Sequence, residues 1–133
     1  MKKNKVKLPT VKSLEARVWK ECVRIIRNKY VHQCICCGKP VEGKQLHTGH
    51  YFRKKFIPIQ MKYDLRLLRP CCSYCNLRLH GNLEWYSVNL IRQEGADYLL
   101  NIAEDIEFYK GEELDTAQKR EFLTRLLDKY KSL

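Results

Sequence analysis

Two pairs of cysteines constrain this chain more than any other feature of its sequence. Cys34 and Cys37 form one Cys-x-x-Cys knuckle, and Cys72 and Cys75 form a second. Each knuckle turns its backbone so that two thiolates face one ion, and four thiolates complete the tetrahedral shell of a structural zinc ion. The spacing therefore predicts a zinc site made by these four cysteines, with Cys-x-x-Cys redox chemistry as the alternative.

The remaining cysteines fit a reduced, metal-binding chain better than a disulfide framework. The chain holds seven cysteines in 133 residues, and an odd number cannot pair fully. Residues 1–7 are basic but lead into no apolar segment of a secretory signal, and no apolar run approaches the roughly 18 residues that span a membrane. We expect a cytoplasmic protein with no membrane partner, with Cys22 in its core and Cys36 and Cys71 as buried thiols.

The positive charge of the chain is concentrated in its first part. The formal net charge is +11. Residues 1–80 carry 19 Lys and Arg against 4 Asp and Glu, whereas residues 81–133 carry 7 against 11. Such asymmetry indicates an anionic partner on one face. Nucleic acid is the first candidate and a membrane surface the weaker one, while a merely solubilising charge is the alternative.

Apolar periodicity predicts helices at both ends of the chain. Residues 12–29 repeat apolar side chains at helical spacing, with Ser13 as the expected N-cap. Helices over residues 83–94 and 96–110 are separated by Gly95. A last helix is expected over about residues 114–131, with an apolar side made by Leu114, Phe122, Leu126 and Leu127.

The segment between the knuckles and the segment that follows them carry further motifs. Thr48-Gly49-His50-Tyr51 lies in the insert, and Cys75 is followed by Asn76 and then by Gly81-Asn82. Together with Cys34–Gly38 and Tyr63-Asp64, these motifs resemble the lambda NinG (Rap) recombination endonuclease family over roughly residues 14–110. The arrangement also resembles His-Me finger (HNH) nucleases and phage endonuclease VII, in which two Cys-x-x-Cys pairs staple the nuclease unit.

The resemblance implies an α+β fold. A zinc-stapled ββα-metal (His-Me finger) unit is expected between an N-terminal helix and C-terminal helices. We divide the chain into a flexible basic arm at residues 1–11, a zinc-containing nuclease domain with flanking helices at residues 12–110, and a C-terminal helix at residues 111–133.

The resemblance also implies a catalytic site around His50. We assign His50 as the general base, because a neutral imidazole with a pKa near ~6.5 accepts a proton at neutral pH. His47 and Asn76 would hold a catalytic Mg²⁺ or Mn²⁺ ion, and His80, four residues after Asn76 and expected on the same face of a helix, is a further candidate ligand. Alternatively, His47 or His50 is an ordinary hairpin residue or replaces a cysteine as zinc ligand.

Two positions depart from the pattern of these families. Leu67 stands where they usually carry an Asn that braces the hairpin loop, and His47 stands where an Asp is common. Since His47 supplies no negative charge, softer ions such as Mn²⁺ or Zn²⁺ stay open beside Mg²⁺.

Basic residues near these motifs are candidates for contacts with the phosphate backbone of DNA. A solvated loop is the alternative for each of them. The candidates are Arg53, Lys54, Lys55, Arg66, Arg69 and Arg78.

The resemblance implies a metal-dependent, structure-selective DNA endonuclease, encoded by a phage or prophage, that cuts branched recombination intermediates such as Holliday junctions or D-loops, whereas composition alone implies only the binding of a polyanion. The alternatives are a non-catalytic, zinc-stapled nucleic-acid-binding module and an HNH nickase that acts on ordinary duplex. Resolving a junction needs two symmetric cuts, so we also expect a homodimer formed through the helical tail.

Overall fold

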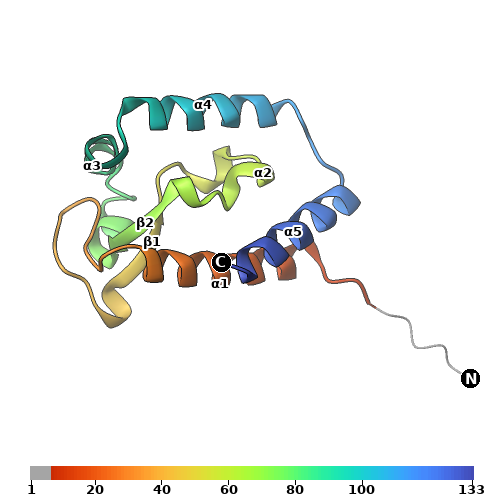
Figure 1. Ribbon diagram of the computed structural model, residues 1–133, viewed down its shortest axis with the longest axis horizontal. Coiled ribbons are helices and arrows are strands. Elements are labelled where there is room, and N and C mark those ends of the chain that lie inside the picture. Colours follow the sequence, from red (N-terminus) through yellow and green to blue (C-terminus); the bar gives the residue numbers. More distant parts are fainter. Residues whose placement is uncertain (1–6) are drawn as a thin grey trace, which may run out of the picture.

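A two-stranded antiparallel sheet lies between helices in the computed structural model, which describes residues 7–133. Helices α1 and α5 lie on one side of the sheet and α4 on the other, with α2 between them (Figure 1). The fold is therefore mixed α+β, as the sequence predicted. The elements are α1 (Val11–Lys29), β1 (Leu46–His50), α2 (Ile59–Lys62), β2 (Leu68–Cys72), α3 (Leu83–Glu94), α4 (Ala96–Lys110) and α5 (Thr116–Lys131), with short 3-10 turns at Gly43–Gln45, Lys54–Phe56 and Leu65–Leu67.

Helix α1 begins earlier than the sequence predicted. Thr10, in an extended conformation, accepts a hydrogen bond from the backbone N–H of Ser13 and is the N-cap, so the prediction of Ser13 as the cap was wrong. Val11 consequently belongs to the helix and not to the predicted arm at residues 1–11, of which residues 1–6 lie outside the described part. The apolar side of α1 that faces the core is confirmed, because Val18 and Cys22 are fully buried.

Helix α5 packs along α1 and closes one of the apolar cores. Leu123, Leu127 and Tyr130 are its buried residues, and Phe122 and Leu126 pack partly buried against the same core. The predicted apolar side is therefore confirmed except at Leu114, which lies before the helix. The Tyr130 hydroxyl donates a 2.6 Å hydrogen bond to the Tyr63 carbonyl. Each buried Leu or Tyr contributes about 2 kcal/mol of apolar burial, which fixes α5 on α1.

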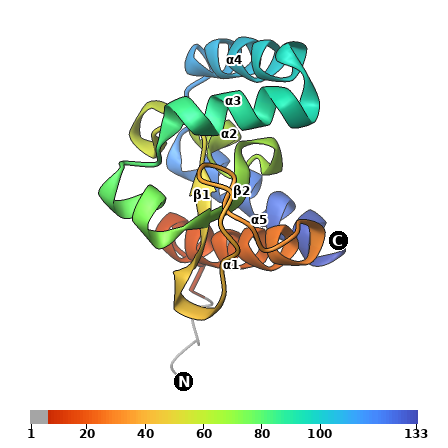
Figure 2. The same ribbon diagram turned by 90° about the vertical axis from the view of Figure 1, so that its left-hand side faces the viewer.

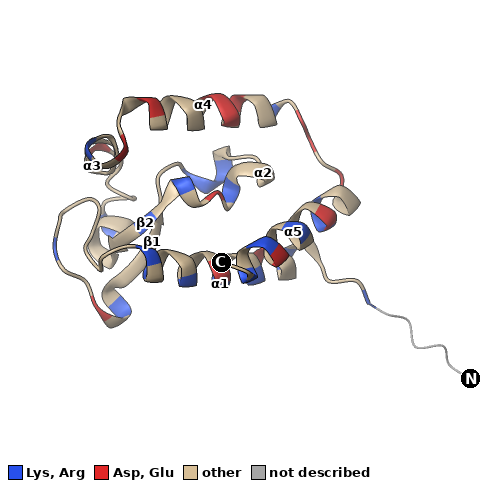
Figure 3. Cartoon of the chain, in the orientation of Figure 1, with Lys and Arg blue, Asp and Glu red and all other residues tan. Residues whose placement is uncertain are grey.

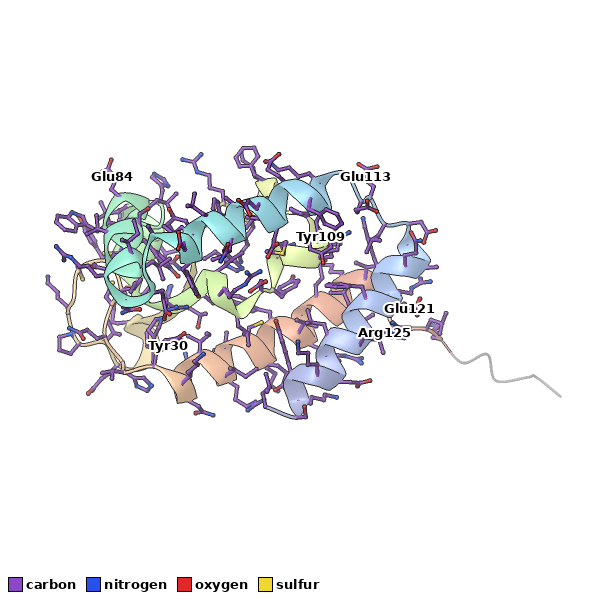
Figure 4. The ribbon with its side chains drawn as sticks, turned by 45° about the horizontal axis from the view of Figure 1, so that its top comes forward. Tyr30, Glu84, Tyr109, Glu113, Glu121 and Arg125 are labelled. Carbon is purple, nitrogen blue, oxygen red and sulfur yellow. The ribbon has the colours of Figure 1, made fainter. Side chains whose placement is uncertain are left out.

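The other predicted helices have the expected bounds. Helices α3 and α4 cover residues 83–94 and 96–110, and Gly95 breaks them apart with φ +88°, a conformation that favours glycine. The start of α5 is fixed by a capping box, in which Asp115 and Gln118 exchange side-chain and backbone hydrogen bonds. Figure 4 shows Glu121 and Arg125 on α5, where they form an exposed 2.6 Å ion pair.

The two strands pair with a register that links distant parts of the sequence. Leu46 faces Cys72 at one end of the ladder, and His50 faces Leu68 at the other. The first knuckle joins the edge of β2, because the Ile35 N–H donates a 2.9 Å hydrogen bond to the Pro70 carbonyl. Figure 2, turned by 90°, shows β1 and β2 side by side above α1.

A buried tyrosine braces the open end of this strand pair. The hydroxyl of Tyr86 lies 2.8 Å from the Gly49 carbonyl and 3.2 Å from the Leu67 carbonyl, so its proton is shared between the two acceptors. The Tyr51 N–H donates a second bond, of 2.8 Å, to the same Leu67 carbonyl. Leu67 is itself fully buried. Tyr86 of α3 thus links the backbone of β1 to the backbone just before β2.

The charges of the chain separate in space as well as in sequence. Figure 3 shows acidic residues along α4 and the segment that leads to α5, while Lys and Arg lie around α1 and α2. Among residues 7–133, no helix is both long enough and apolar enough to cross a membrane. The division of the chain at residue 110 stays a prediction.

The close approach of β1 to β2 gives a testable prediction. A Cβ added at Gly49 would lie 2.9 Å from the Cβ of Cys71, a distance that forces the strands apart. We expect Gly49→Ala to lower the free energy of unfolding by about 2 kcal/mol, measured by urea denaturation. Gly111→Ala is the matched control, because its nearest contact is at 3.7 Å, and it should change stability by less than about 1 kcal/mol. Equal stability of both variants would contradict the tight contact.

Candidate functional site

Four thiols from the two knuckles meet in the structure as the sequence predicted. The Sγ atoms of Cys34, Cys37, Cys72 and Cys75 all lie within 4.8 Å of one another. The Cys37 and Cys72 sulfurs are 3.8 Å apart. Zn–S bonds of about 2.3 Å place the sulfurs of a tetrahedral site about 3.8 Å apart, so the four thiols can bind a metal such as zinc.

Backbone groups support these sulfurs as thiolates. The Cys37 N–H donates to Cys34 Sγ at 3.5 Å, and the Cys75 N–H donates to Cys72 Sγ at 3.3 Å. The Asn82 side-chain amide adds a 3.6 Å contact to Cys75 Sγ. Donors aimed at sulfur stabilise the charged form, and this is the arrangement that a metal-bound thiolate needs.

Two further cysteines lie against this cluster. Cys36 and Cys71 are buried, as expected, and their sulfurs are 3.9 Å apart. With Cys34 they form a second group of three thiols within 4.8 Å. Cys22 lies elsewhere in the core, where burial raises the pKa of its thiol to about 12. The knuckle group is the better metal site, because only it offers four ligands.

A cavity of 420 Å³ opens beside the cluster and gathers most of the predicted catalytic residues. The polar side chains come from α1, from β1 and the segment that follows it, and from the segment after the second knuckle. Within the described residues, no Asp or Glu lines this cavity. Its lining includes Trp19, Val23, Arg27, His47, Thr48, His50, Phe52, Arg53, Lys54, Asn76 and His80.

His50 is held in one neutral tautomer at the end of β1. Its Nε2 lies 3.0 Å from the Lys62 carbonyl, and since a carbonyl only accepts, Nε2 carries the proton. Nδ1 is therefore the nitrogen with the free lone pair. Burial, followed by the charges of Lys54 and Lys62, lowers the pKa of His50 to about 4, so the imidazole is neutral at physiological pH.

His47 and Asn76 are in direct contact. The Asn76 Nδ2 and the His47 Nδ1 are 3.0 Å apart. Neighbouring ligands of an octahedral ion at about 2.1 Å are about 3.0 Å apart as well, so turning the amide by 180° would give an oxygen and a nitrogen at a spacing suited to one ion. The pair supplies two neutral ligands and no carboxylate.

His80 reaches the same cavity for a different reason from the one predicted. The expected α-helix from Asn76 to His80 is absent, because Tyr74–Arg78 form a π-helical turn. His80 follows this turn with φ +51°. It is exposed and still lines the cavity. The spacing argument from helix periodicity was therefore wrong, although His80 and Asn76 do lie at one site.

The predicted phosphate-binding residues divide into two groups. Arg53 and Lys54 are exposed and line the cavity, whereas Lys55 lines a separate hollow against α4. Arg78 is exposed but does not line the cavity. Only Arg53 and Lys54 thus combine a free surface position with closeness to His50.

Arg69 is buried in the fold, which does not support its predicted role in binding DNA, whereas that role stays a prediction for Arg66, which is paired but partly exposed. Arg66 is paired at 2.8 Å with both Asp64 and Asp105. The side chain of Arg69 is only 1% exposed, and its guanidinium contacts Glu94 at 3.3 Å. The buried guanidinium of Arg69 cannot also reach a phosphate without breaking its contacts.

Sequence reasoning missed two residues from α1. The indole of Trp19 stacks on His50, with ring centroids 4.9 Å apart and an interplanar angle of 14°. Arg27 lines the cavity and donates a 3.2 Å hydrogen bond to the Leu46 carbonyl. Trp19 and Arg27 are eight residues apart and so share a helix face, and this spacing was the only signal of their position in the sequence.

Comparison with known proteins places the chain among phage sequences. The family model described as Bacteriophage Lambda NinG protein matches residues 1–131. Two proteins named Protein ninG, from Escherichia phage 933W and from Enterobacteria phage VT2-Sa, are each 36% identical to the chain over 64 residues. The match covers 48% of this chain and 31% of each relative, so the chain spans less than a third of their length. No solved structure matches the chain.

The overlap of the two thiol groups gives a second prediction. We expect Cys37→Ala to weaken zinc binding by more than about 100-fold, because the loss of a ligand costs more than the loss of a supporting partner. Cys36→Ala, the neighbouring control, should retain one zinc ion per chain. Metal analysis after challenge with a chelator measures both. Retention of zinc by Cys37→Ala, with loss by Cys36→Ala, would instead assign the ion to Cys34, Cys36 and Cys71.

Proposed function

The chain belongs to the NinG family, and from this premise we propose that it is a metal-dependent endonuclease that cuts branched DNA. The observation that carries the proposal is the cavity in which His47, His50 and Asn76 meet beside the four-thiol cluster. We further propose that β1, β2 and the segment after the second knuckle form a His-Me finger unit, stapled by zinc.

His50 is the general base in this proposal. Hydrolysis of a phosphodiester needs a proton acceptor beside the attacking water. The Lys62 carbonyl accepts a hydrogen bond from the Nε2–H of His50, and the free lone pair on Nδ1 is left to accept the proton of water. Because the ring is neutral above about pH 4, no deprotonation is needed before the reaction.

Arg53 and Lys54 bind the scissile strand in this proposal. Both are exposed at the cavity, and no carboxylate among the described lining residues neutralises them. Phosphate binding by such side chains depends on salt, because each contact releases counterions from DNA. Arg27 lies on the α1 side of the same cavity, where it can contact the same backbone.

A divalent ion would be held by His47 and Asn76. When bound, it would neutralise charge on the phosphate and assist the leaving oxygen. Asn76 follows Cys75 directly, so zinc bound at the knuckle fixes the backbone that presents the amide. His80 is an additional ligand candidate at the rim of the cavity.

A homodimer completes the proposal, because two symmetric cuts resolve a junction. The helical tail is the interface that we expect. Light scattering of the protein with and without a four-way junction tests this part, and a monomer in both cases would contradict it.

Loss of the base is the direct test of the nuclease. We expect His50→Ala to reduce cleavage of a labelled four-way junction by about 10²–10⁴-fold, while zinc content and DNA affinity stay unchanged. His32→Ala is the matched control, because His32 is exposed and does not line the cavity.

Three outcomes of this test separate the competing functions. Loss of cleavage in His50→Ala alone supports the nuclease. Binding of DNA without cleavage by the wild type would favour a zinc-stapled binding module. Equal cleavage of a matched linear duplex would indicate an HNH nickase.

The ligand set of the cavity also predicts the preferred ion. Mg²⁺ is usually held by one or two carboxylates, and this cavity has none among residues 7–133. We expect Mn²⁺ to support cleavage at least about tenfold better than Mg²⁺, since imidazole suits the softer ion. Rates measured at equal concentrations of each ion check this. His47→Asp is the informative variant, because it should restore activity in Mg²⁺, and an unchanged ion preference would count against His47 as a ligand.

A further inference from the structure

The general base of the proposed nuclease is restrained by a helix that lies outside the zinc-stapled unit. The Nε2 of this base, His50, is fixed by the hydrogen bond to the Lys62 carbonyl, but one hydrogen bond leaves the ring free to turn about that contact. The indole of Trp19 lies almost parallel to the imidazole, with an interplanar angle of 14° and ring centroids 4.9 Å apart. The stack removes the remaining rotation, because the two planes must stay parallel.

We propose that Trp19 of α1 is a positioning residue that sets the plane of His50 and so the direction of its Nδ1 lone pair. This inference rests on the proposed function, in which Nδ1 accepts a proton. General-base catalysis depends on such alignment, and misplacement by about 1 Å costs on the order of 100-fold in rate.

The same helix also holds the partner of the His50 hydrogen bond. Glu15, one turn before Trp19, forms a 2.9 Å ion pair with the side chain of Lys62. The backbone carbonyl of the same Lys62 accepts the hydrogen bond from His50. The Tyr63 hydroxyl donates a 3.0 Å bond to the same carboxylate. Glu15 and Trp19 lie on one helix face at a spacing of four residues, so α1 controls both contacts of the imidazole.

The rigidity of α1 makes it suitable for this role. Val18, next to Trp19, is fully buried in the core shared with α5. The rings of Trp19 and Tyr63 also pack in a tilted arrangement with their centroids 6.5 Å apart, so the indole is itself supported on a second side. A side chain that is locked by packing can hold another in place, whereas a solvated one cannot.

Trp19 also keeps a basic side chain beside the base. Lys54 Nζ lies 4.8 Å from the centroid of the same indole, a cation–π contact. Lys54 and Lys62 are the cations nearest His50, and Glu15 pairs with Lys62. The other charged or titratable groups that line the cavity are Arg27, Arg53, His47 and His80.

Removal of the indole should therefore change the titration of His50 in a known direction. Burial lowers the pKa of His50 to about 4, and Trp19 supplies one wall of that burial. In Trp19→Leu, water reaches the ring, the charged form is less disfavoured, and the pKa should rise toward 6.5. A role in the fold alone would change stability without changing this pKa.

The test combines His50 NMR with cleavage in Trp19→Leu, Trp19→Phe and Trp85→Leu. Trp85 is the matched control, because it is the other tryptophan of the chain and is exposed on α3 away from the cavity. We expect Trp19→Leu to raise the His50 pKa by at least about one unit, mix its tautomers and reduce cleavage by about 10–100-fold. Trp19→Phe, which keeps an aromatic plane, should recover most of the cleavage, and Trp85→Leu should match the wild type.

A folded Trp19→Leu variant with the wild-type pKa, tautomer and cleavage rate would overturn the inference. Movement of the His50 resonances in Trp19→Leu, with no cleavage by any variant or the wild type, would support the positioning contact but overturn the nuclease. The NMR measurement needs no DNA, so the two failures are distinguishable.

A second measurement covers the case in which Trp19→Leu does not fold. In Trp85→Phe, Trp19 is the sole tryptophan, and protonation of the stacked imidazole should quench its fluorescence as the pH falls. The same transition should be absent from Trp85→Phe with His50→Ala. An identical transition in both proteins would overturn the inference without any change at Trp19.

Discussion

The pairing of β1 with β2 is the constraint on which the rest of the structure depends. One end of the ladder places Leu46 opposite Cys72 of the thiol cluster, and the other end places His50 opposite Leu68. A slip by one residue would turn every side chain of a strand to the opposite face and would move His50 away from the cavity. In the observed register Gly49 lies against Cys71 with no room for a Cβ, so the two strands are in close contact. Metal binding and the proposed catalysis are therefore coupled through a short ladder.

Two strands alone form a weakly stable sheet, so the surrounding helices stabilise it. Helix α3 contributes Tyr86, whose hydroxyl closes the open end of the ladder. Helix α1 covers it from below in Figure 1 and contacts His50 through Trp19. The four-thiol cluster restrains the end of the ladder at which Leu46 faces Cys72. Helix α3, helix α1 and the four-thiol cluster thus each stabilise a different part of the small sheet.

The sequence predicted what depends on local spacing and failed where long-range contacts decide. The knuckles, α3 and α4 follow from short-range patterns, and the structure agrees with them. The burial of Arg69 was not predictable, because its partner Glu94 is distant in sequence and a lone Arg beside a basic segment resembles a DNA contact. The stack of Trp19 on His50 joins residues that no sequence motif connects. The prediction of an α-helix after Cys75 was wrong for another reason, because the π-helical turn that forms there has no distinctive sequence pattern.

The absence of carboxylates among the described residues of the cavity has a consequence for how the proposed nuclease would work. His47 and Asn76 are neutral, and the nearby Arg53 and Lys54 repel a cation. The protein alone would therefore bind a divalent ion weakly, and the negative charge of a bound phosphate would strengthen that binding. Linkage requires the converse as well, so the ion must raise the affinity for the strand by the same factor. In the proposed nuclease the ion and the DNA strand would therefore bind together, and the protein without DNA would hold little of the ion.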